Sequence, residues 1–421
     1  MIFLKLAIKS LRNRAFSTTL TVISICLSVT LLLTVERAKR AAEEGFTQTI
    51  SRTDLIVGAR SGPLQLILYT VFNMGNATHN ISYDSYKTIS QLPNVAWTIP
   101  YSLGDGHRGF RVVGTNEDFF KYYHYRGYQK VELEQGVPFD KLWDVVIGAD
   151  VANKLGYKLG NRIVISHGVT KTEGVLNHDD KPFVVSGIMK PTGTPLDRAV
   201  YVSLEGMEAL HLDWQDGSAP TSDKVIPKEK ISKENIKVDT ITAFFLGAKS
   251  RAETLRLQRE INDFKSEPLL AIIPGVVLSE LWQGLSYIEG VLRGISWMVV
   301  VVGFLGMLIA LTTTLNERRR EMAILRAVGA RSFQIVGLLV FESALLTTLG
   351  VLFGVLLSYV SMAVLGPWAE REFGLYLAGA AFTKKELLYV IVTLVGGTVI
   401  GLIPALRAQR LALKDGLSIK I

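Results

Sequence analysis

The sequence predicts an α-helical membrane protein with four transmembrane helices plus a large α+β extracytoplasmic domain inserted between helices 1 and 2. One observation is the composition, which is 48% hydrophobic, a high share for a water-soluble protein. A second is that the apolar residues gather in four windows, each close to the roughly 20 residues that cross a bilayer. The third is that residues 36–293, between the first two windows, have patterns that predict a mixture of strands and helices. The windows are 15–35, 294–315, 336–365 and 387–406.

Two alternatives to four retained membrane helices are weaker. Buried core helices of a soluble protein would show an apolar and a polar face, which these windows lack. The first window follows a basic N-terminus, so it could be the apolar region of a cleaved signal peptide. Its 21 uncharged residues exceed the usual length of such a region, and we therefore favour a retained anchor. The single cysteine, Cys26, lies inside this window, which excludes an intramolecular disulfide.

Positive charge is concentrated beside the predicted helices. Segments 1–14, 316–332 and 407–421 contain 13 basic and three acidic residues, although the net charge of the whole chain is only +8. Basic residues in short loops stay cytoplasmic, so both termini and segment 316–332 are expected inside the cell. This places 36–293 and the short loop 366–386 outside. It also assigns the basic residues to membrane lipid and not to nucleic acid.

The flanks of the windows are also expected to be helical. Residues 1–14 can form an amphipathic helix on the cytoplasmic membrane surface, although an ordinary positive flank would look the same. The residues after 35 predict a helical stalk that leaves the membrane. Residues 276–292 predict a helix that runs directly into the second window.

The segment 36–293 predicts an α+β domain. Short runs of β-branched and aromatic residues between turn formers indicate strands. They are 54–60, 109–115, 144–149, 161–166, 182–189, 199–204 and 240–247. Helices are expected at 83–91, 149–155, 204–210 and 251–264. The segment 219–237 is rich in Pro, Lys and Ser and predicts a solvated loop.

The segment 62–76, "GPLQLILYTVFNMGN", is strongly apolar for a region beside a strand. A buried helix is the favoured interpretation. The alternative is an exposed patch that contacts a partner or a lipophilic cargo. The residues of that patch would be Leu64, Leu66, Leu68 and Phe72.

Recognisable catalytic motifs are absent from the sequence. There is no Gly-x-x-x-x-Gly-Lys-Ser/Thr loop for nucleotide phosphates, no Gly-x-Ser-x-Gly, no His-Glu-x-x-His and no Cys-x-x-Cys. No catalytic, cofactor-binding or metal site is therefore predicted. Histidines and aspartates do gather within 47 residues, and imidazole with carboxylate could bind zinc. Their spacing fits no compact motif, so solvated loop side chains are favoured. They are His167, His178, Asp179, Asp180, His211 and Asp213.

Polar and small residues inside the last two windows indicate helix packing. Glu342 lies within the third window, where an ionisable group is costly and usually faces the protein interior. The alternative is a position near the headgroups. Gly350 and Gly354, and likewise Gly397 and Gly401, form Gly-x-x-x-Gly stripes that allow helices to approach closely.

The segment 316–332, "NERRREMAILRAVGARS", is the most unusual part of the chain, because charges fill the gap between two apolar windows. Met322, Leu325 and Val328 share one helical face, and Gly329 can end the helix. The pattern predicts a short amphipathic helix that contacts a partner. A helical anchor with inside-positive charge is the alternative.

At this point the chain resembles the FtsX-like, or MacB-type, ABC transporter permeases along essentially its full length. "NERRREMAILRAVGA" is similar to the family's signature after the second span, and Glu342, Gly350 and Gly354 are similar to its third span. "PALRAQRLALKDGL" (404–417) resembles its tail, apart from a proline that the family often has near Leu413. "VVIGADVANKLGYKLGNRIVI" and "FVVSGIMKPTGTPLDRAVYVSL" resemble its periplasmic core.

The resemblance implies a permease subunit of a type VII ABC transporter in the bacterial inner membrane, with a separate cytoplasmic ABC ATPase dimer that holds ATP and Mg²⁺. The chain itself would be no enzyme. In this family the helix after the second span docks on the ATPase. That role falls here to Glu317, Arg319, Arg320, Glu321, Met322, Leu325, Arg326, Val328 and Gly329.

Two functions remain open under this resemblance. The first is export or extraction of a substrate from the periplasm or the outer leaflet. The second is mechanotransmission without transport, which would regulate an envelope enzyme or a signalling partner. Expected partners are a second permease copy or paralogue and a periplasmic adaptor, lipoprotein or envelope enzyme.

Overall fold

The computed structural model describes residues 14–168, 178–213, 226–313, 322, 324–373 and 382–407. The chain divides into two compact units. A helical unit comprises Met1–Ala42, Leu285–Ala369 and Leu377–Ile421, and an α+β unit consists mainly of Glu43–Gly284. Four helices among the described residues are long and apolar enough to cross a membrane. The predicted combination of four apolar helices with a large α+β domain is therefore confirmed.

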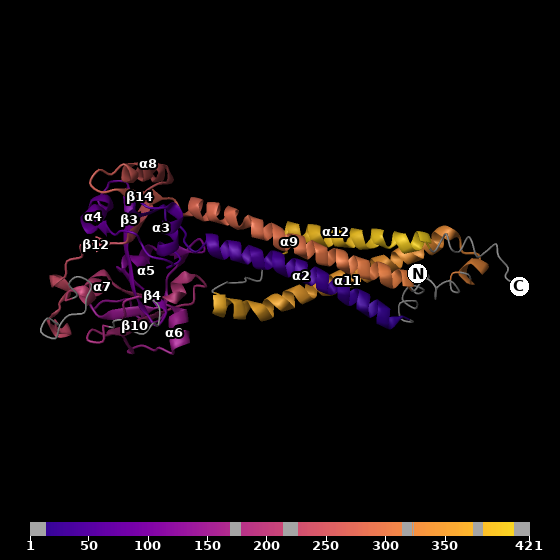
Figure 1. Ribbon diagram of the computed structural model, residues 1–421, viewed down its shortest axis with the longest axis horizontal. Helices are drawn as coiled ribbons and strands as arrows, with labels where there is room; N and C mark the ends of the chain where they lie inside the picture. Colours follow the sequence, from indigo (N-terminus) through magenta and orange to yellow (C-terminus); the bar gives the residue numbers. More distant parts are fainter. Residues whose placement is uncertain are drawn as a thin grey trace. The chain divides into compact units, whose positions relative to one another are not determined.

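The helical unit buries only a narrow stripe of each helix. Between 22% and 33% of each apolar window is buried, and large apolar side chains such as Phe16, Met298 and Val364 are exposed. Every one of these helices exposes apolar side chains, which is favourable in the hydrocarbon of a membrane and unfavourable in water. Figure 1 shows the helices running alongside one another. They are α2 (Ala15–Thr47), α9 (Pro274–Thr313), α11 (Ser332–Phe373) and α12 (Lys384–Ile400).

These helices are longer than the apolar windows. The first continues to Thr47, as expected for a stalk, and α9 begins at Pro274 and includes the helix expected at 276–292. The third continues past Pro367 into the expected loop 366–386. The helix expected at 1–14 and the tail 407–421 lie almost entirely outside the described residues.

The α+β unit is built on a mixed sheet of ten strands. Its order is β14 (Leu269–Ile272), β1 (Leu55–Ala59), β13 (Ala243–Ala248), β3 (Val95–His107), β4 (Phe110–Thr115), β11 (Ala199–Ser203), β8 (Asp144–Ile147), β10 (Phe183–Met189) and β7 (Leu133–Gly136), while β9 (Arg162–Ile163) pairs with β10. The seven predicted strands are confirmed. Three strands of this sheet were not predicted: β14, β7, and β3, whose Pro100 and glycines obscure a strand pattern.

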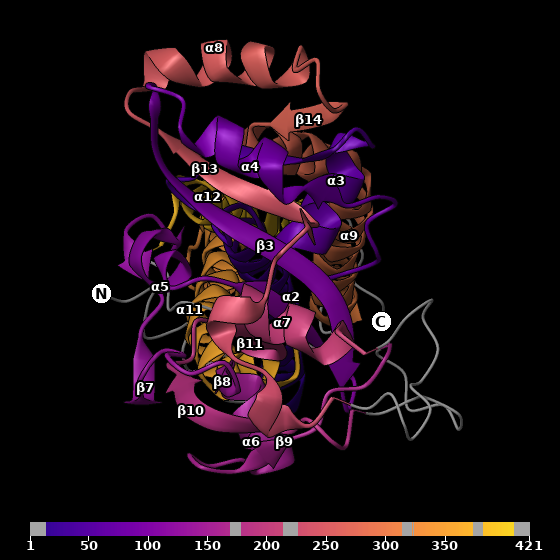
Figure 2. The ribbon, with the colours of Figure 1, turned by 90° about the vertical axis from the view of Figure 1, so that its left-hand side faces the viewer.

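The long strand β3 connects the two halves of the sheet (Figure 2). It pairs with β13 through its first half and with β4 through its second half, and both pairings are antiparallel. A β-bulge interrupts the second pairing between Leu103 and Gly106. Parallel pairing occurs between β11 and β4 and between β10 and β8.

Helices cover both faces of the sheet. In β1 alternate side chains enter opposite cores: Ile56 packs with an aromatic cluster, while Leu55 and Val57 pack with the side chains of α8. Figure 2 shows α8 at the β14 end and α6 at the β10 end. The helices are α3 (Pro63–Thr70), α4 (Tyr83–Ser90), α5 (Asp118–Tyr122), α6 (Ala149–Leu155), α7 (Leu204–His211) and α8 (Arg251–Asn262), and the four predicted ones are confirmed.

Short elements complete the unit. Two small antiparallel pairs lie off the main sheet, β2 with β12 and β5 with β6. Their bounds, and those of three 3₁₀ turns, are β2 (Ile81–Ser82), β12 (Thr240–Ile241), β5 (His124–Tyr125), β6 (Gln129–Lys130), η1 (Pro195–Arg198), η3 (Lys228–Lys230) and η4 (Lys233–Asn235).

Candidate functional site

A buried ion pair joins α2 to the start of α12. Nε and Nη2 of Arg37 donate to the two carboxylate oxygens of Glu386 at 3.3 and 3.2 Å, which is a bidentate arrangement. Arg37 is 3% exposed and Glu386 is 0% exposed. A charge in such a position is tolerated only when a partner and further hydrogen bonds compensate for the loss of water.

Neighbouring groups complete the surroundings of this ion pair. Nη1 of Arg37 donates to Oγ of Ser358 at 3.2 Å, and the guanidinium carbon lies 3.9 Å from the ring centre of Tyr359. The hydroxyl of Thr383 caps α12 by accepting from the backbone N–H of Glu386. In a capping box the side chain of Glu386 would reach back to the cap residue, but here it binds Arg37 instead. Sequence analysis missed this ion pair, because nothing in the sequence links two charges so far apart.

Hydroxyl groups add three polar contacts between α2 and its neighbours. Ser28 donates to the carbonyl of Val299 in α9, and Thr30 donates to the carbonyl of Gly354 in α11, both at 3.1 Å. The hydroxyls of Thr34 and Ser361 are also 3.1 Å apart. Hydrogen bonds of this kind between membrane helices contribute about 0.6–2 kcal/mol each.

Both glycine stripes lie at helix contacts, as their spacing indicated. A Cβ atom at Gly350 would lie 2.7 Å from the side chain of Ile25, and one at Gly354 would lie 2.8 Å from Cβ of Val29. These glycines therefore let α11 approach α2 almost to backbone contact. In α12, Gly397 and Gly401 face Thr347 and Ser343 of α11 in the same way.

The intramembrane acid Glu342 is 2% exposed. Its side chain is therefore buried within the helical unit. This agrees with the general expectation for an ionisable group in a membrane helix.

Only part of the predicted ATPase-coupling segment is described. Glu317, Arg319, Arg320 and Glu321 lie outside the described residues. Residues 324–327 are helical, and Gly329, with φ of +100°, ends the turn as predicted.

The three residues of the predicted apolar face, Met322, Leu325 and Val328, differ in their exposure to solvent. Met322 is buried against Ile335, Leu339 and Ala405, so it belongs to the helical unit itself. Leu325 is half-buried, and Arg326 donates to the hydroxyl of Ser332 at 2.7 Å. Val328 is 83% exposed and Ile324 is 57% exposed, one helical turn apart. A surface contact would therefore use Ile324 and Val328, and Met322 is excluded from it.

The apolar segment 62–76 forms the buried helix that was favoured. Leu66 is 0% exposed and packs on β1, where a Cβ at Gly58 would lie 2.7 Å from its side chain. Leu68 is half-buried, and Phe72 stacks on Phe46 with ring centres 4.6 Å apart. The alternative of an exposed patch is wrong for Leu66. Of the four proposed contact residues, Leu64 alone is exposed, at 41%.

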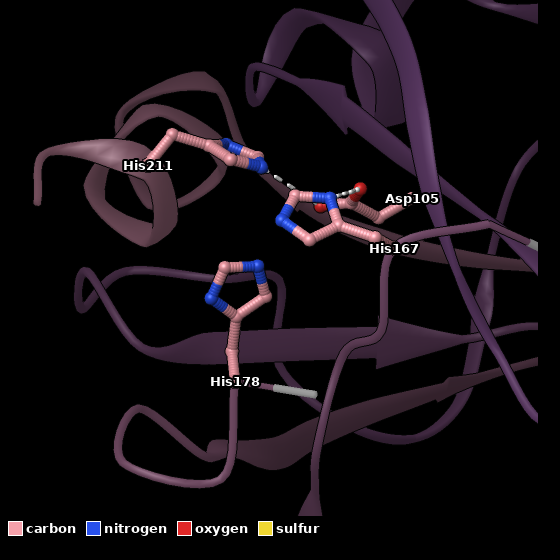
Figure 3. Close-up of side chains that lie close together, drawn as sticks. All are labelled: Asp105, His167, His178 and His211. Carbon is pink, nitrogen blue, oxygen red and sulfur yellow. Dashed lines mark hydrogen bonds and ion pairs between the residues drawn. The ribbon is translucent and has the colours of Figure 1, made fainter. Parts of the chain in front are cut away.

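Three of the histidines come together with an aspartate that the sequence did not single out. Asp105, His167, His178 and His211 place one potential ligand atom each within 4.8 Å of one another (Figure 3). The expectation of solvated loop side chains is wrong for His178, which is fully buried. It is also wrong for Asp213, which instead forms an ion pair with the buried Lys181.

Charge and burial set the protonation of this cluster. Burial, together with the charge of His211, lowers the pKa of His178 to about 4, so its imidazole is neutral at pH 7. Burial alone would raise the pKa of Asp105, but the hydrogen bond from His211 and the charge of the histidines hold it below its ordinary value. For His211, burial opposes protonation, while the hydrogen bond to Asp105 raises the pKa above the ordinary value.

Comparison with known proteins gives matches over most of the chain. Residues 18–262 match the MacB-like periplasmic core domain, and residues 293–415 match the FtsX-like permease C-terminal family. The macrolide export ATP-binding/permease protein MacB of Nitrobacter winogradskyi is 24% identical over 97% of this chain and 58% of that protein. MacB of Marinobacter nauticus is 24% identical over 86% of this chain and 53% of that protein.

The chain thus spans little more than half the length of these two relatives. Among solved structures, the periplasmic region of MacB from Actinobacillus actinomycetemcomitans matches 54% of this chain and 91% of that chain. The TM-score is 0.33 and the sequence identity is 9%.

Proposed function

Since the chain belongs to the ABC transporter permeases that carry a MacB-like periplasmic core domain and an FtsX-like C-terminal part, we propose that it transmits mechanical work. In this proposal a cytoplasmic ABC ATPase hydrolyses ATP with Mg²⁺, and the helices of this chain convert the closure of the ATPase dimer into movement of the α+β unit outside the membrane.

Two unbroken helices are the observation that carries this proposal. The boundary between the two units falls within α2, after Ala42, and within α9, before Leu285. Each helix therefore continues from the helical unit into the α+β unit. In this proposal a displacement of the apolar part of each helix is passed along its hydrogen-bonded turns to the other end.

The contacts of α2 support its role as a lever. The ion pair of Arg37 with Glu386 and the glycine contacts at Gly350 and Gly354 attach α2 to α11 and α12. Packed helices with complementary surfaces move as bodies and do not deform gradually. A push on the cytoplasmic end of α11 would thus move α2 with it.

We place the ATPase contact on the segment after α9. Ile324 and Val328 form an exposed apolar pair one turn apart, the spacing with which a helix enters a groove on a partner. The basic residues of this segment support a cytoplasmic location for it, where the ATPase would lie.

The substrate proposal follows from the relatives, which are named for macrolide export. We propose export or extraction of a lipophilic compound from the periplasm or the outer leaflet. In this proposal the α+β unit handles the substrate, with an adaptor or a second permease chain as further partners.

The test measures ATPase binding by variants of the exposed pair. Val328→Asp in the full chain should lose co-purification of the ATPase and the ATP turnover of the complex. A charge in the core of an interface costs on the order of 2–5 kcal/mol, or a 30- to several-thousand-fold loss of affinity. Val328→Thr, which keeps the shape without a charge, is the matched control and should retain most binding.

A variant in the buried neighbour separates binding from folding. Met322→Asp should lower the amount of intact protein, because Met322 packs inside the helical unit. If Val328→Asp and Ile324→Asp insert normally and keep both the ATPase and its turnover, this segment is only a charged anchor and the coupling proposal is wrong.

A further inference from the structure

We propose that Asp105, His167, His178 and His211 form a binding site for a divalent transition-metal ion, with Zn²⁺ as the ion that their chemistry favours. One potential ligand atom from each residue lies within 4.8 Å of the others. Figure 3 shows the imidazole rings of the three histidines gathered around one space, with the carboxylate of Asp105 beside His167 and His211. The inference does not depend on the transport proposal, because it concerns the α+β unit alone.

The fold directs these four side chains to one place. Asp105 lies in the bulge of β3, where the ladder with β4 is interrupted between Leu103 and Gly106. A bulge turns a side chain out of the regular alternation of a strand, which is why bulges often lie beside functional sites. Beyond the bulge, Gly106 and Ser166 exchange two backbone hydrogen bonds of 2.9 and 2.8 Å. This bridge holds the neighbouring His167 beside Asp105.

Two further segments supply the other histidines. The backbone N–H of His178 donates to the carbonyl of Ile165 at 2.9 Å, so His178 lies against the strand-like segment that leads to His167. His211 is the last residue of α7. The four residues thus come from four places in the chain that meet only in the folded unit.

The orientation of His211 is that of a metal ligand. Its Nδ1 lies 3.1 Å from the carbonyl of Met207, which can only accept, so Nδ1 carries a proton. Nε2 then faces Asp105, 3.2 Å from Oδ2. Metal-binding histidines generally donate their second N–H to a carbonyl or carboxylate in this way, because the bond fixes the ring and the tautomer.

The charge around the cluster favours a cation. The carboxylate of Asp105 is 8% exposed and lies 3.0 Å from Nδ1 of His167. The nearest buried lysine, Lys181, does not oppose a positive ion, because it is in an ion pair with the buried Asp213 and also binds the carbonyl of Leu210. When the ion binds, Nε2 of His211 releases the proton that it shares with Asp105. A divalent ion with three neutral imidazoles and one carboxylate then leaves a net charge of only +1.

A neighbouring histidine shows what an ordinary structural histidine looks like in this unit. His107 contacts the carbonyl of Val164 through Nδ1 and the hydroxyl of Tyr157 through Nε2, and it does not belong to the cluster. A hydrogen-bond network that only compensates the charge of Asp105 would require no histidines other than His167 and His211. His178 contributes a buried third imidazole, with its ring centre 4.7 Å from that of His167 and 5.3 Å from that of His211.

The donor set selects the class of ion. Three imidazole nitrogens and one carboxylate oxygen suit Zn²⁺, which prefers four ligands in a tetrahedron with bonds of about 2.0–2.2 Å. Ligand atoms in such a site are about 3.3 Å apart, so the cluster must contract somewhat around the ion. His167 and His211 have side chains that are 32% and 35% exposed, which leaves them room to move.

Four protein ligands indicate a structural site and not a catalytic one, because a catalytic zinc keeps an open position. A bound ion would join the end of α7 and the segments that hold His167 and His178 to the bulge of β3. Occupancy would therefore stabilise this end of the α+β unit.

The test uses the full chain in detergent, purified without a histidine tag and freed of metal with EDTA. Zinc is titrated in competition with a chromophoric chelator. We expect one Zn²⁺ per chain and a rise in the unfolding temperature on binding. Asp105→Asn and His211→Ala should each weaken binding by more than about 100-fold, since even residues behind the ligands cost 10- to 100-fold. His79→Ala, at an exposed histidine, is the matched control and should bind like the wild type.

Cobalt provides a measurement that does not need variants. One equivalent of Co²⁺ added to the metal-free wild type should give the intense visible bands of a tetrahedral site, and Zn²⁺ should displace them. No bands at one equivalent, or zinc affinity equal in the wild type and in the Asp105→Asn/His211→Ala double variant, would overturn the proposal.

Discussion

The guanidinium of Arg37 forms two hydrogen bonds with the carboxylate of Glu386, although 349 positions separate the two residues in the sequence. The pair connects the part of α2 that follows its apolar stretch with the first turn of α12. Because both side chains are buried, each is the main compensation for the other's loss of water. Arg37 also contacts Ser358 and Tyr359, and Arg40 lies 3.7 Å from Glu386.

Removal of one partner of this ion pair should destabilise the helical unit. Arg37→Met leaves the carboxylate of Glu386 buried without its main partner, and we expect a loss of about 3–5 kcal/mol in the free energy of unfolding. The measurement is thermal unfolding of the full chain in detergent. Lys385→Ala, at an exposed basic residue beside Glu386, is the control and should change little.

A double variant separates the loss of the pair from the burial of a lone charge. Arg37→Met/Glu386→Leu removes both charges, so it should recover much of the stability lost in Arg37→Met. Equal instability of the single and double variants would contradict a compensating ion pair.

A methyl group at Gly354 should separate α2 from α11. The added Cβ would lie 2.8 Å from Cβ of Val29 and 2.9 Å from the carbonyl of Cys26, so one helix has to move. We expect Gly354→Ala to cost about 1–3 kcal/mol in the same unfolding measurement. Gly337→Ala is the matched control in α11, since nothing lies within 4 Å of its added Cβ. An unchanged unfolding temperature in Gly354→Ala would mean that the two helices are not in close contact.

Two leucines of α3 distinguish a core helix from a contact surface. Leu66→Asp places an unpaired charge in the core of the α+β unit and should abolish folded protein, as judged by protease resistance. Leu64→Asp, at the exposed position, should leave protease resistance unchanged. If Leu64→Asp folds but loses export activity in cells, Leu64 is part of a partner or cargo surface; full activity would exclude this role.

The orientation of the chain can be tested by thiol labelling in intact cells, in a Cys26→Ser background. A cysteine at Lys230, in the expected outer domain, should react with a membrane-impermeant maleimide. A cysteine at the exposed Val328 should react only after the inner membrane is permeabilised. The reverse pattern would contradict the orientation inferred from the positive charges.

The sequence by itself determined the general plan of this protein. Four long apolar windows allow few structures other than membrane helices, because the backbone of each segment must satisfy its own hydrogen bonds in lipid. Seven strands and four helices of the α+β unit were also predictable, since alternation, caps and turn formers act over a few residues. The glycine stripes belong to the same class, because their spacing on a helix directly indicates a contact face.

The tertiary structure decided which distant residues meet. Arg37 with Glu386, and Asp105 with His167, His178 and His211, depend on contacts between elements far apart in the chain, and short-range patterns carry no information about them. The strand β3 shows the reason. Its proline and glycines obscure a strand pattern, yet pairing with β13 and β4 holds it extended, and the bulge in that pairing turns Asp105 toward the histidines.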